Sequence, residues 1–404
     1  MMSGNGTSTS TFKRWQTPAL ILGLVGLVLA LVGAFLNQPQ FWQSYLLAYL
    51  FWLEVGLGCL GLLMLHHLVG GRWSGLIRRL LETGAMTLPL LALLFIPLVI
   101  GMNTLYPWLN AAHVQQSELL QLKTGWLNAP FFLGRSAFYF LVWLVLALLF
   151  NRWSLAQDRA QGTAEAAKFT TRMRRLSAAG MILYMLTATF AGYDWLMSLE
   201  PEWFSSIYGL LWIVGQALAA LSLAIIGLGM VARERGTTQA WVKSFNDLGN
   251  FLLGFVMIWA YVTYSQFLVI WSADIPEEGI WYYHRTQGGW QTVALVLIAV
   301  HFVLPFVLLL SRSLKRSVPW LTAVALLVFL ARGVDLIWLI VPAFYPVGVH
   351  VHWLDLALWL AIGGGWVMFF TRQWSGKAAL PIHDPHVGDS HEAHEEFTPT
   401  EQTA

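Results

Sequence analysis

The chain has 404 residues, of which 57% are hydrophobic and only 11% are charged, and its formal net charge is +2. Charged residues supply about a quarter of an ordinary soluble domain. The composition therefore excludes such a domain and predicts an integral membrane protein.

Ten apolar stretches are long enough to cross a bilayer, which takes about 20 residues of helix. Backbone polar groups in lipid must be satisfied within the segment, so an all-α polytopic bundle is expected. The predicted spans, in chain order, are 18–36, 45–68, 87–105, 130–151, 174–197, 204–231, 245–272, 288–311, 318–341 and 352–371.

The two ends of the chain are hydrophilic. Residues 1–17 are rich in Ser and Thr and predict an unstructured cytoplasmic tail. Residues 18–44 predict a peripheral helix that is retained in the mature protein, followed by an exterior loop. Residues 377–404 predict a disordered cytoplasmic tail. Its histidines alternate with acidic residues; metal binding and a solvated tail are both compatible with this pattern, and the solvated tail is favoured. They are His383, His386, His391 and His394.

Lys and Arg are distributed unequally between the two sides of this arrangement. Nineteen of the 23 lie on one side, Lys123 and Arg285 lie on the other, and Arg135 and Arg332 fall within spans. By the positive-inside rule, both termini are predicted to be cytoplasmic. Two longer connections, 106–129 and 272–287, are then exterior, and their aromatic residues fit either an interfacial girdle or a surface for an exterior partner.

A weak internal repeat links the fifth and ninth spans. Gly192, Asp194 and Pro201 recur after 141 residues as Gly333, Asp335 and Pro342. This offset predicts a first four-helix bundle over 45–203 and a second over 204–342, followed by helix 10 within 343–376. The implied geometry is a parallel repeat about an axis along the membrane normal.

Seven ionisable side chains fall inside or at the edge of the spans. Such residues are costly in lipid and are by default functional candidates with a partner. A structural ion pair is the alternative role for each, and Arg332 and Asp335, three residues apart, share a helix face on which they can neutralise each other. The seven are Glu54, Arg135, Asp194, His301, Arg332, Asp335 and Asp355.

Helix rise suggests how these groups are arranged in depth. Arg135, Asp194, Arg332, Asp335 and Asp355 are predicted in the exterior half, with Glu54 and His301 near the middle. A proton route would continue toward the cytoplasm through His66, His67, Tyr184 and Thr187. Hydrogen bonding of the last two hydroxyls to their own helix backbone is the competing interpretation.

Residues that bind redox metals are scarce. Cys59 is the only cysteine, so this chain alone cannot ligate an iron–sulfur cluster or form a cysteine-based zinc site. His301, His66, His67, His350 and His352 lie at different predicted depths, which disfavours a haem held by two histidines. No metal site and no covalently bound cofactor are expected.

Four segments carry a resemblance to a known family: "LYPWLN", "GRSAFYF", "AGYDWLMSLEPEWFSSIYG" and "VHFVLPFVLLLSR". With the ten-span topology, they make the chain similar to NrfD-like membrane subunits of quinone-linked oxidoreductases, and most similar to ActF-type subunits of alternative complex III. The strongest motif runs from Asp194 to Phe204. The resemblance implies a bacterial inner-membrane subunit of a quinol:cytochrome c or cupredoxin oxidoreductase, in a respiratory or photosynthetic chain.

The same resemblance implies the partners. Haem and iron–sulfur clusters would lie in multihaem cytochrome c and iron–sulfur subunits, beside a second, ActC-like NrfD subunit, small membrane subunits and lipid. Quinol or quinone could bind this chain, although the ActC-like subunit is the more usual site. No nucleic-acid partner is expected. A structural anchor and an ion-coupled secondary transporter remain alternatives; Pro97 and Pro305 interrupt two spans, but these are not in corresponding positions of the repeat.

Overall fold

The computed structural model describes residues 10–375 and 377–381, and within them every regular element is a helix. Nine helices are long and apolar enough to cross a membrane in this described part, and a tenth span is formed if a bent pair is counted as one. The chain is therefore an all-α, multi-pass membrane protein, as the sequence predicts.

The spans follow the predicted order. They are α1 (Ser10–Leu36), α2 (Gln38–Val69), the pair formed by α4 (Arg78–Ala85) and α5 (Leu88–Leu93) with α6 (Ile96–Leu105), α9 (Ala129–Asp158), α10 (Thr163–Trp195), α11 (Tyr208–Arg235), α12 (Gln239–Ala273), α14 (Trp290–Leu297) continuing through η3 (Ile298–Val303) into α15 (Leu304–Leu310), α17 (Val318–Ile340) and α18 (Trp353–Trp374).

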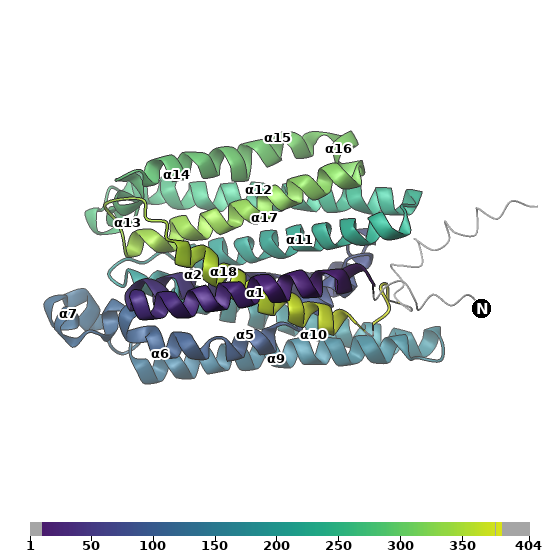
Figure 1. Cartoon of the computed structure of the whole chain (residues 1–404), viewed down its shortest axis with the longest axis horizontal. Coiled ribbons are helices and arrows are strands. Elements are labelled where there is room, and N and C mark those ends of the chain that lie inside the picture. Colours follow the sequence, from purple (N-terminus) through teal and green to yellow (C-terminus); the bar gives the residue numbers. More distant parts are fainter. Residues whose placement is uncertain (1–9, 376, 382–404) are drawn as a thin grey trace, which may run out of the picture.

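Short helices lie between them. They are α3 (Arg72–Gly75), η1 (Pro107–Leu109), α7 (Ala111–Gln116), α8 (Glu118–Lys123), η2 (Met197–Leu199), α13 (Pro276–Thr286), α16 (Arg312–Arg316) and η4 (Val341–Ala343). Figure 1 shows α7 and α13 at one end of the bundle and α16 at the other. These are called the α13 end and the α16 end below.

Two boundaries differ from the predicted ones. Helix α1 begins at Ser10, so residues 10–17 are helical; residues 1–9 lie outside the described part. The third span begins at Arg78 rather than at residue 87, and it bends by 59° between Leu93 and Ile96. Pro97 explains the bend, because its ring clashes with the carbonyl of Leu93 and it donates no hydrogen bond.

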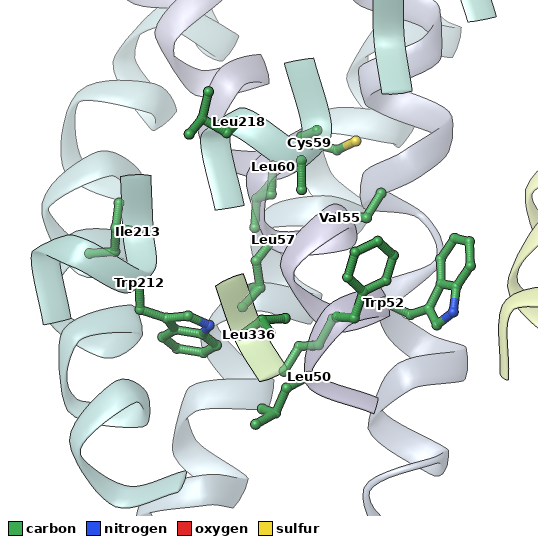
Figure 2. Close-up of a cluster of buried hydrophobic side chains, with 14 of the residues drawn as sticks. Leu50, Trp52, Val55, Leu57, Cys59, Leu60, Trp212, Ile213, Leu218 and Leu336 are labelled. Atoms are coloured by element: carbon green, nitrogen blue, oxygen red, sulfur yellow. The ribbon is translucent and has the colours of Figure 1, made fainter. Parts of the chain in front are cut away.

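Helix α2 is the centre of the molecule. It packs against α4, α5, α6 and α10 on one side, against α11 on another, and against α18. Figure 2 shows Leu57 and Leu60 of α2 in a buried core with Leu218 of α11 and Leu336 of α17. Gly58 permits this contact, since a Cβ there would lie 1.9 Å from the carbonyl oxygen of Gln216.

The other spans surround this centre in two groups. Helices α5, α6, α9 and α10 lie below α2 in Figure 1, and α12, α14, α15 and α17 lie on the opposite side with α11. Helices α1 and α18 pack along each other across the front, where Gly26 approaches the backbone of Ala357 too closely for any side chain. The predicted duplication of a four-helix unit stays a prediction.

Candidate functional site

The predicted intramembrane charges form two separate clusters, one around Asp194 and one around Arg332. The first joins α9 to α10. The second joins α2, α12, α17 and the π-helical segment η3. Both are buried, and they differ in how completely their polar atoms are paired.

In the first cluster, each carboxylate oxygen of Asp194 accepts two hydrogen bonds. Arg135 donates from Nε to Oδ2 and from Nη2 to Oδ1, both at 2.8 Å. Trp126 Nε1 donates to Oδ1 at 3.0 Å, and the Tyr139 hydroxyl donates to Oδ2 at 2.8 Å. Arg135 also donates to the carbonyl of Trp126, and its guanidinium lies over the rings of both Trp126 and Phe131. One carboxylate and one guanidinium are thus balanced and enclosed.

In the second cluster, Arg332 bridges two carboxylates. Its Nη2 and Nε donate to Glu54 Oε1 and Oε2 at 2.6 and 2.9 Å, and its Nη1 donates to Asp335 Oδ2. Glu54 and Arg332 have no exposed surface. Gly215 on α11 makes room for the guanidinium, because a Cβ at Gly215 would lie 2.4 Å from Arg332 Cζ.

His301 completes the second cluster without being hydrogen-bonded. Its Nδ1 lies 3.9 Å from Asp335 Oδ2, too far for a hydrogen bond, and neither ring nitrogen has a partner among the described residues. Its ring lies against Trp259, whose Nε1 donates to the same Asp335 oxygen at 2.8 Å. Three buried side chains, those of Arg332, Trp259 and His301, therefore meet at one oxygen of Asp335, and only His301 makes no hydrogen bond to it.

The backbone around His301 is unusual as well. Residues Ile298–Val303 form a π-helical turn, and Leu304 N donates to Ala299 O, five residues earlier. Pro305 cannot donate to the carbonyl of His301, four residues earlier, which favours local rewinding. Single π turns inside α-helices are frequent at functional sites. Here the turn sets the imidazole against Asp335.

Charge differs between the clusters. Arg135 and Asp194 balance each other, whereas Glu54 and Asp335 share a single guanidinium. An uncompensated charge in an apolar interior costs several kcal/mol. A proton held by a carboxylate or by His301 would balance the second cluster, and the unpaired imidazole is the obvious group through which that proton could enter or leave.

Arg332 and Asp335 are predicted in the exterior half of the bilayer and Glu54 near its middle. In the structure Arg332 contacts both carboxylates, so α17 and α2 are joined directly through its guanidinium. The predicted depths themselves stay predictions. The predicted neutralisation of Asp335 by Arg332 is confirmed.

Asp355 belongs to neither cluster. It accepts a hydrogen bond from the backbone of His352, whose imidazole accepts one from the backbone of Leu354, so the two residues cap the start of α18. The Ser44 hydroxyl also donates to Asp355 at 2.5 Å. These contacts give Asp355 a helix-capping role.

The two predicted hydroxyl relays differ in the group to which they donate. Thr187 donates to the carbonyl of Leu183 in its own helix and accepts from Trp143 Nε1, as the competing interpretation predicts. Tyr184 instead donates to Gln216 Oε1 on α11 at 2.6 Å. Gln216 follows Gly215, so Tyr184 reaches the neighbourhood of the Arg332 cluster.

His66 and His67 lie toward the α16 end. Their rings contact each other, His66 Nδ1 lies 2.5 Å from the Ser74 hydroxyl, and His67 stacks on Phe150. Of the predicted site residues, the structure brings Glu54, Arg332, Asp335 and His301 together.

A buried network at the α16 end was missed by sequence reasoning. Glu82 accepts hydrogen bonds from Arg78 Nε at 2.8 Å, from Arg79 Nη1 at 2.6 Å and from the Ser154 hydroxyl at 2.7 Å. Asp158 is a further partner of Arg79. Arg78 and Arg79 fall in a predicted connection between two spans. They precede Glu82 by four and three residues, which is the spacing of ion pairs within a helix, and this spacing could have predicted the network.

A second ion pair that the sequence did not predict lies at the α13 end. Arg285 Nη2 donates to Glu200 Oε2 at 2.7 Å, and His284 Nδ1 lies 2.8 Å from Oε1. Burial alone would raise the pKa of Glu200, but the Arg285 charge and these hydrogen bonds outweigh it and lower that pKa. The bridge fixes α13 to the segment that follows α10.

Two cavities of about 310 Å³ each are large enough for part of a small molecule. One lies among α1, α2, α11 and α18 and is apolar. The other adjoins the Asp194 cluster through Trp126 and is also lined by Lys123. Burial lowers the pKa of Lys123, with Glu202 acting in the opposite direction. Lys123 Nζ donates to the carbonyl of Pro201 at 2.5 Å.

In the described part of the chain, no group of three or more His, Cys, Asp or Glu residues is arranged to hold a metal ion. Cys59 is buried. The four histidines of the predicted tail, His383 to His394, lie outside the described residues. Known proteins add no further constraint on the site: no protein-family model matches the chain, and a search of curated proteins returns no significant match.

Proposed function

We propose that this protein is an NrfD-like membrane subunit, of the ActF type, in a bacterial quinol:electron-acceptor oxidoreductase, alternative complex III. Its role there is to support quinol oxidation by moving protons, with both termini in the cytoplasm and the α13 end outside. The family assignment rests on the sequence resemblance. The proton role rests on one observation, the buried cluster in which one guanidinium serves two carboxylates beside an unpaired imidazole.

Quinol oxidation releases two electrons and two protons, so a subunit without redox centres can still contribute bases. Carboxylates and imidazoles accept protons when their environment tunes them. Asp335 and His301 are adjacent, buried and joined to Glu54 by Arg332, so a proton bound by one group changes the charge balance of all four. The electron acceptors belong to partner subunits with haem and iron–sulfur clusters.

The two alternative functions, a structural anchor and an ion-coupled transporter, give the same residues other roles. In an anchor subunit, the Arg332 cluster would only hold α2 to α17. In an ion-coupled transporter, broken helices in corresponding positions of two repeats would form the substrate site. Here the bend before Pro97 and the π turn before Pro305 lie in the second span of one predicted unit and the third of the other, which weighs against the transporter.

Purification from native membranes tests the complex assignment. We expect a mildly solubilised, tagged chain to copurify in fixed stoichiometry with c-type haem, seen in reduced-minus-oxidised spectra, and with an iron–sulfur signal in electron paramagnetic resonance. Quinol-dependent reduction of cytochrome c or a cupredoxin should follow the same fractions. A chain that purifies free of haem and iron, while that activity elutes elsewhere, would refute the assignment.

A further inference from the structure

Helix α12 exposes two tyrosines, whereas no other span exposes a tyrosine among the described residues. Tyr261 is 71% exposed and Tyr264 is 60% exposed. Among the described residues, the third exposed tyrosine is Tyr283, on the short helix α13 outside the spans. Exposed tryptophans of this part all lie near a helix end or in a connection, as expected at a membrane interface. Tyr261 breaks that pattern.

Its position along α12 puts Tyr261 deep in the bilayer. The nearest charged residues of the helix region are Asp247, 14 residues before it, and Asp274, 13 residues after it. At a rise of about 1.5 Å per residue, both lie roughly 20 Å away along the axis. Trp259, two residues earlier, hydrogen-bonds Asp335 in the central cluster. A phenol cannot extend from this depth to the headgroups.

The hydroxyls of Tyr261 and Tyr264 make no hydrogen bond within the described residues. A hydroxyl transferred to an apolar environment without a partner costs about 2 kcal/mol or more. Lipid tails offer no acceptor at this depth. The exposed hydroxyls therefore require an acceptor supplied by a molecule that covers this face.

The shape of the face indicates what that molecule is. Exposed side chains at Ile258, Tyr261 and Leu268, with Ser265 between them, repeat at intervals of four and three residues. Gly254 extends the same spacing, and a Cβ there would meet nothing within 4 Å. This is the spacing by which one helix packs along another. From Gly254 to Leu268 the face is about 21 Å long, more than a single ring-shaped ligand covers.

We infer that this face of α12 is the docking surface for a transmembrane helix of another polypeptide, one that presents a hydrogen-bond acceptor near the middle of the bilayer. Ser, Thr, Asn or Gln, or a backbone carbonyl freed by proline, supplies such an acceptor. A second copy of this chain fits less well, because two Tyr261 hydroxyls facing each other satisfy only one of their two hydrogens.

Photo-crosslinking in native membranes tests this surface. A benzophenone amino acid replaces Ile258 in one variant and Leu268 in a second, which serves if the first does not accumulate. Val145, an exposed aliphatic residue in the middle of α9, carries the probe in the control. We expect a crosslink from α12, and none from Val145, to a peptide within a transmembrane helix of a different polypeptide.

The hydroxyl is tested in the same membranes. Tyr261→Phe should lower the crosslink yield from position 258 about threefold or more, the effect of one lost hydrogen bond between membrane helices. Tyr283→Phe should leave it unchanged. Crosslinks to lipid alone, to a second copy of this chain or to a peptide outside the membrane would overturn the inference, as would an unchanged yield in Tyr261→Phe. Copurification of haem and iron is a separate readout, so failure here does not decide the proposed function.

Discussion

Asp194 and Asp335 stand at equivalent positions of the predicted repeat, yet their surroundings differ in kind. Asp194 has a guanidinium of its own and accepts four hydrogen bonds. Asp335 shares Arg332 with Glu54, and the imidazole of His301 beside it is unpaired. A closed, neutral pair holds two helices together, whereas an unequal set of charges has a place for a proton. Within a single chain, the comparison distinguishes a buried carboxylate with a structural role from one that can take part in proton exchange.

The largest effect is expected from Arg332→Met. This change leaves Glu54 and Asp335 buried without a cation, and breaking a buried pair costs about 3–5 kcal/mol. We expect little folded protein in the membrane, measured by quantitative blotting and by thermal unfolding in detergent. The triple variant Arg332→Met, Glu54→Leu, Asp335→Leu removes the charges together and should recover much of the folded protein. A triple variant no better than Arg332→Met would argue against the charge-balance explanation.

Asp194→Asn and Asp335→Asn should affect stability unequally. Asp194→Asn leaves Arg135 buried and unpaired, at a cost of about 3 kcal/mol. Asp335→Asn leaves Glu54 and Arg332 as a balanced pair and should cost no more than about 1 kcal/mol. Thermal unfolding of the two purified variants measures the difference. Equal losses would remove the distinction between the two clusters.

The bridge at the α13 end gives a pH dependence. Because the pKa of Glu200 is lowered in the folded state, its contribution is fully present above the ordinary glutamate pKa of 4.5 and is lost as the pH falls through the lower folded pKa. Glu200→Gln should therefore destabilise the protein by about 1–3 kcal/mol at pH 7. The gap between the wild type and this variant in thermal unfolding should narrow as the pH is lowered below 4.5; a gap independent of pH would contradict the charged bridge.

Thr187→Val should have the smallest effect. The hydroxyl bonds mainly to its own helix, so its removal costs about 1 kcal/mol through the lost partner of Trp143. Proton transfer by the assembled complex should be unchanged, which makes this variant the control for the loss of a buried hydroxyl. A large loss of proton transfer in Thr187→Val would restore it to the route.

Much of the fold could be predicted because apolar length fixes membrane spans. The ten predicted segments recur as helices, and Pro97 and Pro305 marked the two irregular ones. The site could be predicted only as a set of candidates. Depth along a helix can be counted from sequence, but rotation about its axis cannot, so the contact of Arg332 with Glu54 could not be predicted. Glu82 was missed because the third span was assigned a start after it.

The unpaired state of His301 was also beyond sequence. The histidine was predicted to be central, but the π turn and the contact with Trp259 depend on how η3 packs against α12 and α17. The same limit applies to Asp355, whose capping role follows from the precise start of α18. Residue type and depth identify candidates, and packing decides between their roles.

The central claim is that the Arg332 cluster exchanges protons during turnover. The direct measurement is the number of protons moved per electron by the complex in sealed proteoliposomes, for wild type, His301→Leu, Asp335→Asn and the Thr187→Val control. We expect assembled complexes in all four, with quinol-driven proton movement reduced on the order of tenfold or more in His301→Leu and Asp335→Asn and unchanged in Thr187→Val. A wild-type proton-to-electron ratio and rate in both His301→Leu and Asp335→Asn would contradict the claim and leave the cluster as a structural link between α2 and α17.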